Sequence, residues 1–123
     1  MRSMWIGVAG FAGAVARYHV EGLVSRQTRG AFPWGTFAVN ISGCFLLGLL
    51  VTLLTERFLA DPTVRVALTI GFVGAYTTFS TFAYESLRLG EDGAVGLATL
   101  NVVASVAVGI LAVWLGTVAG RAV

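Results

Sequence analysis

Four stretches without a charged residue divide the chain, and the charges gather in the short segments between them. These stretches are residues 3–16, 30–55, 66–84 and 93–120. A helix of about 20 apolar residues crosses the roughly 30 Å hydrocarbon core of a bilayer. The pattern therefore predicts an all-α membrane protein, with residues 1–123 forming a single domain of four transmembrane helices. We expect these helices at about residues 4–24, 35–54, 66–89 and 93–118.

The third stretch, residues 66–84, is interrupted in its middle by residues that weaken a helix. Gly71 and Gly74 precede the run TTFSTF at residues 77–82, and both glycine and β-branched residues are poor helix formers. Inside a membrane, backbone groups freed from a helix must be satisfied by protein, ions or water. We therefore expect the third helix to be broken at mid-membrane, where a break commonly forms an ion or substrate site.

The run at residues 77–82 carries two kinds of chemistry. Phe79 and Phe82 are three residues apart and share a helix face, so the weakly positive edges of two rings can contact a small anion. The unwound backbone carbonyls suit a hard cation such as Na⁺, as do the nearby hydroxyl groups. These hydroxyl groups belong to Thr77, Thr78, Ser80 and Thr81. The alternative is ordinary packing, with the phenylalanines facing lipid or the core and the hydroxyl groups packing the helix.

A charged residue, Arg17, belongs to the first predicted helix, because the charge-free stretch before it is too short to span alone. An arginine inside a span needs a partner, a water-filled cavity or a route to the membrane surface. Glu21 stands one turn later and could pair with it. Arg17 therefore has two possible roles, which are structural anchoring and attraction of anions to a vestibule.

Two further polar features lie within the predicted spans. Asn40 is the one strongly polar residue of the helix at 35–54, and a buried amide costs free energy unless it is hydrogen-bonded. Its NH₂ group can bond a neighbouring helix or donate to an anion. In the last helix, Asn101, Ser105 and Gly109 lie four residues apart and share one face. This stripe could line a pore or pack tightly against another helix.

Composition excludes several classes of function. The chain is 57% hydrophobic and 11% charged, about half the charged fraction of a typical soluble domain. Its eight arginines leave a formal net charge of only +2, too small and too scattered for nucleic-acid binding. One cysteine and one histidine exclude a disulfide scaffold and a metal site built from several such residues. No nucleophile has a candidate base partner, so we do not expect an enzyme.

The arginines are distributed almost evenly between the two predicted sides of the membrane. In a chain of four spans, one side would carry Arg2, Arg57, Arg65 and Arg121. The other side would carry Arg26, Arg29 and Arg88, with Arg17 if its side chain reaches outward. Because arginine and lysine in short loops normally set orientation, we expect the chain to insert both ways up and to pair as an antiparallel, dual-topology homodimer.

Three segments in the first three predicted helices together resemble the Fluc (CrcB-type) family of fluoride channels. They are GFAGAVARY at residues 10–18, GTFAVNISG at 35–43 and GFVGAYTTFSTF at 71–82. The resemblance implies a passive, fluoride-selective channel that exports fluoride from the cytoplasm. It also implies an antiparallel homodimer in membrane lipid, with two pores and a central structural Na⁺. Such a multi-pass protein is expected in the plasma membrane, which in bacteria is the inner membrane.

The resemblance also implies roles for individual residues. The expected fluoride path is lined by Asn40, Phe79, Ser80, Thr81, Phe82 and Ser105. Gly74 and Thr77 match the positions whose backbone carbonyls hold the Na⁺, and Arg17 matches the family's vestibule arginine. The sequence departs from the family in the last helix, where Asn101 replaces an expected tyrosine and Gly109 an expected serine.

The closest competing hypothesis is a small multidrug-resistance-type exporter, which couples proton movement to drug export and shares the length, four spans and dual topology. Such an exporter needs an acidic residue deep in the first helix, but the deeper charge there is Arg17, and Glu21 lies near the helix end. A membrane subunit that only packs against partners is a third possibility, and it would leave the run at residues 77–82 without a role.

Overall fold

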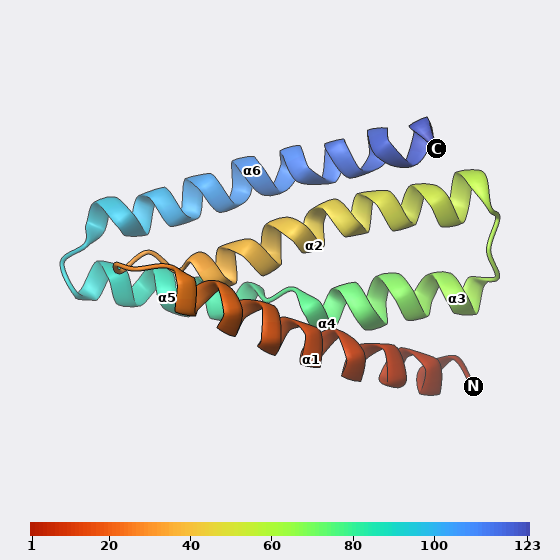
Figure 1. The fold of residues 1–123 in the computed structure, drawn as a ribbon, viewed down its shortest axis with the longest axis horizontal. Helices are drawn as coiled ribbons and strands as arrows, with labels where there is room; N and C mark the ends of the chain where they lie inside the picture. The colour runs from red at the N-terminus through yellow and green to blue at the C-terminus, as the bar shows by residue number, and fades with distance from the viewer.

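The computed structural model describes residues 1–123 as helices joined by short turns, with no β-strand. Its elements in chain order are α1 (Arg2–Gln27), α2 (Trp34–Thr52), η1 (Leu53–Arg57), α3 (Pro62–Val66), η2 (Ala67–Val73), α4 (Gly74–Tyr76), α5 (Phe79–Glu91) and α6 (Val95–Ala122). The segments η1 and η2 are π-helical. In Figure 1 the chain forms α1, then α2 continued by η1, then a third helix divided into α3, η2, α4 and α5, and finally α6.

The four helices alternate in direction, so the N-terminus, the turn between η1 and α3, and the C-terminus lie at one end (Figure 1). Two contacts join the end of α6 to η1 there. Arg121 donates to both carboxylate oxygens of Glu56 at 3.1 Å, and Arg57 donates to the Val123 carbonyl. The two ends of the molecule thus correspond to the two predicted sides of the membrane between which the arginines are divided.

Three helices are long and apolar enough to cross a membrane, and they make the chain a multi-pass membrane protein. They are Trp34–Arg57, Pro62–Glu91 and Val95–Ala122. Although α1 has 26 residues, it is not among the three, and its second half carries Arg17, His19 and Glu21. The prediction of four spans therefore holds for three helices, and a span by α1 stays a prediction.

Two helix boundaries differ from the predicted ones for identifiable reasons. The third helix begins at Pro62 and not at 66, because the Asp61 carboxylate caps it by accepting from the Thr63 N–H at 2.7 Å. Proline is well tolerated in the first turn of a helix. Hydrogen bonds from Thr63 hold the pKa of the Asp61 carboxyl below its usual value. The last helix begins at Val95, because Gly93 has a left-handed φ of +84°.

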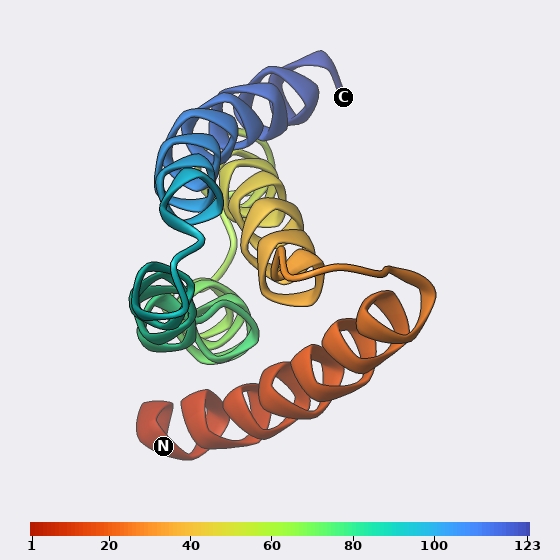
Figure 2. The same cartoon turned by 90° about the vertical axis from the view of Figure 1, so that its left-hand side faces the viewer.

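Small residues let the helices approach one another closely, which matters where lipid gives no hydrophobic drive for association. Gly48 and Gly116 lie where α2 meets α6, and a Cβ at either would collide with the backbone of the other helix. Gly13 has the same role in α1, because a Cβ there would collide with the Phe72 carbonyl in η2. Figure 2 shows α2 beside α6, while α1 runs along the third helix.

The chain alone has little interior, since only 17 of its 123 residues are buried. Large apolar side chains are exposed along the helices, among them Ile70, Phe79, Val103 and Ile110. Soluble monomers rarely expose so much contiguous apolar surface. The surface therefore suits contact with lipid or with another protein.

The third helix is interrupted at Thr77 and Thr78, between α4 and α5 (Figure 1). Both residues have an extended backbone, with φ −87° and ψ 159° at Thr77 and φ −148° and ψ 107° at Thr78. The π-helical segment η2 ends one turn earlier, and π-helical turns are rare features that often lie at functional sites. The depth of the interruption in a membrane stays a prediction.

Candidate functional site

The side chain of Asn40 on α2 replaces the hydrogen bonds that the third helix loses at Thr78. Its Nδ2 donates to the Thr78 carbonyl at 3.0 Å, and its Oδ1 accepts from the Thr78 N–H at 2.7 Å. Both backbone polar groups of this extended residue are therefore satisfied. Of the two roles considered for Asn40, the interhelical hydrogen bond is present. The amide has a second N–H, and that group has no partner within the chain.

The Thr78 side chain is the N-cap of α5. Its Oγ1 accepts from the Thr81 N–H at 3.3 Å and donates to Thr81 Oγ1 at 2.9 Å, while Ser80 Oγ lies 3.5 Å away. A cap of this kind typically stabilises a helix by about 1 kcal/mol. The hydroxyl groups of Ser80 and Thr81 are thus gathered around the start of α5.

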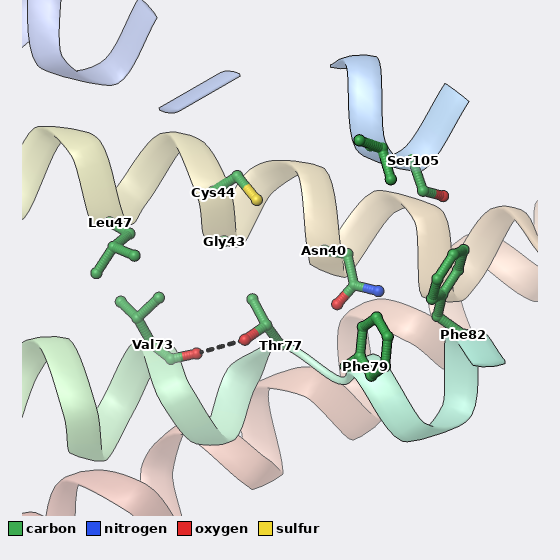
Figure 3. Close-up of a pocket in the computed structure, with 10 residues that line it drawn as sticks. Asn40, Gly43, Cys44, Leu47, Val73, Thr77, Phe79, Phe82 and Ser105 are labelled. Carbon is green, nitrogen blue, oxygen red and sulfur yellow. Dashed lines mark hydrogen bonds between the residues drawn. The ribbon is translucent and has the colours of Figure 1, made fainter. Parts of the chain in front are cut away.

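A pocket of about 270 Å³ lies between α2, the interruption, α5 and α6. Five residues that the sequence predicted for an ion path or an ion site line it: Asn40, Thr77, Phe79, Phe82 and Ser105. The remaining lining is Gly43, Cys44, Leu47, Val73 and Val106. Figure 3 shows the rings of Phe79 and Phe82 beside the Asn40 amide, with ring centroids 5.6 Å apart. No charged side chain lines the pocket, so an ion there would meet an amide, hydroxyl groups and ring edges.

Four of the six side chains expected along a fluoride path line this pocket. The two that do not are Ser80 and Thr81, whose hydroxyl groups lie beside that of Thr78. The Phe79 side chain is 79% exposed, so its ring also reaches the uncovered face of the chain. The roles of these residues in conduction stay predictions.

The polar stripe on α6 packs against its neighbours. Asn101 is 1% exposed, and its Nδ2 donates to Ser86 Oγ on α5 at 2.9 Å. Ser105 donates to Asn101 Oδ1 at 3.3 Å, which directs its hydroxyl hydrogen along α6. Gly109 is buried near Cys44 on α2. Of the two roles considered for the stripe, tight packing is therefore present, and Ser105 also lines the pocket.

The carbonyl oxygens of Gly74 and Thr77 meet one requirement for a Na⁺ site, because neither keeps its regular helical donor. In an uninterrupted helix each would accept from the N–H four residues later. The Thr78 N–H instead donates to Asn40, and the Thr81 N–H donates to the Thr78 hydroxyl. Carbonyl oxygens of an unwound helix suit Na⁺. The residues present therefore fit such an ion, whose binding stays a prediction.

Arg17 forms no ion pair within the chain, so the possible pairing with Glu21 is not present. The Glu21 carboxylate lies instead on the side of α1 that packs against α2. Gly35 of α2 makes this approach possible, because a Cβ there would come within 3.0 Å of Glu21 Cγ. A vestibule role for Arg17 stays a prediction.

Sequence reasoning missed a cluster of two carboxylates around the buried hydroxyl of Thr36. Thr36 Oγ1 donates to Glu85 Oε1 at 2.8 Å, and Glu21 Oε1 lies 3.5 Å from the same hydroxyl. The second carboxylate oxygen of Glu85 is buried without a hydrogen-bond partner. The available signal was that Glu21 and Glu85 stand near the ends of two helices that run in the same direction.

The fold and the pocket define the chain as a small, multi-pass helical membrane protein with an interrupted helix beside an uncharged pocket. Residues 4–117 match the family model described as CrcB-like protein, Camphor Resistance (CrcB). The chain therefore belongs to the CrcB family.

Three relatives are each 48% identical to the chain and are named "Fluoride-specific ion channel FluC". The protein from Acidobacterium capsulatum aligns over 98% of this chain and 97% of its own length. The proteins from Geotalea daltonii and Geobacter sulfurreducens align over 96% and 94% of this chain, and over 95% and 94% of their own lengths. The similarity thus extends over nearly the whole of each protein.

Proposed function

We propose that the chain is a passive, fluoride-selective channel. Relatives that match it over nearly its full length carry the name of a fluoride-specific ion channel. The observation that carries the proposal is the pocket in which the Asn40 amide meets the rings of Phe79 and Phe82 beside the interrupted helix.

Fluoride is small and strongly hydrated, so a pore must replace part of its water with donors. The unpartnered N–H of Asn40 and the ring edges of Phe79 and Phe82 can supply them. Conduction also requires binding that is weak enough for the ion to leave. A pocket without a fixed cation meets this requirement, because an arginine would hold the anion more tightly.

In this proposal, two chains pair in antiparallel orientation and form two pores, with phenylalanines contributed by both chains. The near-equal arginine content of the two ends supports dual topology. Gly74 and Phe79 are exposed beside the pocket, so one chain leaves this face open for a second copy. A single chain with so few buried residues also has little interior for a solute path.

A structural Na⁺ completes the proposed dimer. Gly74 and Thr77 of each chain would hold it through their backbone carbonyls, because these carbonyls have lost their helical donors. When bound, the ion supplies positive charge that offsets the repulsion between fluoride ions nearby. Arg17, which has no acidic partner, would attract fluoride to the vestibule.

A passive channel lets fluoride move down its concentration gradient, which sets the direction of transport. Fluoride that accumulates in the cytoplasm would leave the cell down its gradient through a multi-pass protein of the plasma membrane, the inner membrane in bacteria. The proton-coupled exporter is not favoured, because no acidic residue lies deep in α1 and the relatives carry a channel's name.

Ion efflux from liposomes tests this proposal. Purified protein is reconstituted into vesicles loaded with potassium fluoride and potassium chloride, and valinomycin is added to release potassium. We expect rapid fluoride efflux at a fluoride electrode, with chloride retained as in protein-free vesicles. Fluoride retention by vesicles with folded protein would contradict the proposal, and proton-driven drug uptake would support the exporter instead.

A further inference from the structure

Tyr76 is a buried residue of the short turn α4, and its hydroxyl is bonded to α2. The residue is 6% exposed, and its hydroxyl oxygen lies 2.8 Å from Ser42 Oγ. Ser42 donates to the Ala38 carbonyl at 2.7 Å, so the tyrosine is the donor in the bond between them. The ring also stacks on Phe72, with centroids 6.1 Å apart and planes at 7°. Tyr76 is therefore held at both its ring and its hydroxyl.

The turn α4 depends on such contacts for its geometry. It is the last turn of a helical run that continues from Pro62 to Tyr76, and the extended residue Thr77 follows it directly. Helix ends fray, so contacts with a neighbouring helix help to hold this turn in place. The carbonyls of Gly74 and Thr77 flank Tyr76 and lack their regular helical donors, so their direction depends on where the turn is held. Gly43 of α2 faces Thr77 (Figure 3), and a Cβ at Gly43 would come within 3.3 Å of the Tyr76 ring.

We infer that Tyr76 and Ser42 are positioning residues for the proposed Na⁺ site. Their hydrogen bond fixes α4 against α2 and thereby aims the carbonyls of Gly74 and Thr77 at the ion. The inference rests on the proposed function for the ion itself, and it adds two residues that do not touch the ion. Loss of the bond lets the turn rotate, which weakens the site without removing any ligand.

The test compares Tyr76→Phe, Ser42→Ala and the double variant with the original chain. Tyr76→Phe removes one oxygen and keeps the ring that stacks on Phe72. Tyr84→Phe is the matched control, because Tyr84 is 64% exposed and makes no side-chain hydrogen bond. The measurement is the melting temperature of purified protein in detergent, with sodium replacing potassium stepwise at constant ionic strength.

We expect sodium to raise the melting temperature of the original chain and of Tyr84→Phe to the same degree. In Tyr76→Phe and Ser42→Ala, the sodium concentration for half of this rise should increase about fivefold, the effect of one hydrogen bond of typical strength. The double variant should match the single variants, because both substitutions remove the same bond. A purely structural role would lower the melting temperature equally in sodium and in potassium.

Two results would overturn the inference: no sodium effect on the original chain, or an unchanged sodium dependence in both single variants. Fluoride efflux from liposomes, measured on the same preparations, separates this outcome from the proposed channel. Fluoride efflux without a sodium response would contradict the positioning role and still support the proposed channel. A shifted sodium response without any efflux supports the positioning role and contradicts the channel.

Discussion

At the scale of single residues, the amide of Asn40 suits the interrupted helix because it donates and accepts at once. The Thr78 backbone needs both an acceptor for its N–H and a donor for its carbonyl, and Asn40 provides the two within 3.0 Å. An aspartate could only accept, and an apolar residue could do neither. The same amide keeps one N–H for a ligand, so a single side chain serves both the backbone and the pocket.

The first prediction concerns Asn40→Ala, which leaves both backbone groups of Thr78 unpaired. Because buried unpaired polar groups cost about 1–3 kcal/mol each, the melting temperature in detergent should fall. Fluoride efflux should also fall by about tenfold or more. Thr99→Ala is the control, since it removes only an exposed hydroxyl bonded within its own helix. Melting and efflux equal to those of the control would contradict the assigned role.

Several pocket residues could be predicted from the sequence because their side-chain types and spacing alone indicate a site. Phe79, Phe82 and Asn40 were singled out by spacing and by the cost of a polar group in a span, and all three line the pocket. The partners of Glu21 and Glu85 could not be predicted in this way. They depend on the rotation of α1 about its axis, which follows from the fit of glycines such as Gly35 against neighbouring helices.

At the scale of elements, α2 acts as a template for the interrupted third helix. Asn40 bonds the extended residue Thr78, Ser42 bonds Tyr76, and Gly43 leaves space for Thr77. These three residues of α2 lie within about one helical turn. The geometry of the interruption is therefore set by α2 as well as by the sequence of the interruption itself.

A second prediction follows for Gly43→Ala. The added methyl group would collide with Thr77, and overpacking of this kind typically costs 1–3 kcal/mol. We expect a lower melting temperature together with reduced fluoride efflux. Gly22→Ala is the matched control, because no neighbouring atom lies within 4 Å of its added methyl group. Equal behaviour of the two variants would show that α2 does not constrain the interruption.

A third prediction concerns the contact between α5 and α6. Asn101→Ala removes the partner of both Ser86 and Ser105, so we expect destabilisation of about 1–3 kcal/mol in detergent unfolding. Val103→Ala on the same helix is the control, since Val103 is 59% exposed. If both variants unfold alike, the polar stripe on α6 does not hold these helices together.

The hydropathy pattern located the helices better than it located their ends. Long charge-free stretches and the weak helix formers at residues 77–82 are strong signals, and the third helix is interrupted within that run. The start of α3 was placed too late because the cap formed by Asp61 before Pro62 was overlooked. The π-helical segments η1 and η2 could not be predicted, because the register of backbone hydrogen bonds depends on packing and has no clear sequence signal.

For the molecule as a whole, the proposed channel needs a second copy of the chain. One chain buries few residues, exposes the Phe79 ring and leaves the Gly74 face uncovered. These features would be costly in water, and they are reasonable for half of a dimer in lipid. The sequence predicts the dimer from the arginine distribution, which is independent of the packing, and the dimer stays a prediction.

The fourth prediction concerns orientation in the membrane. Reporters fused to the C-terminus, one active only inside the membrane and one only outside, should both be active in the original chain. In the double variant Arg26→Ala/Arg29→Ala, one end loses two arginines and the balance is broken, so one reporter should dominate. A single orientation of the original chain would contradict the antiparallel dimer.

In the proposed channel, fluoride crosses the membrane through the pocket beside the interrupted third helix. Fluoride efflux from liposomes that carry Phe82→Ile tests it most directly, with Phe11→Ile as the control because Phe11 is 74% exposed on α1. Both variants should elute as dimers in size-exclusion chromatography. We expect Phe82→Ile to lower efflux about tenfold or more and Phe11→Ile to keep the original rate. Undiminished efflux through the Phe82→Ile dimer would contradict the account.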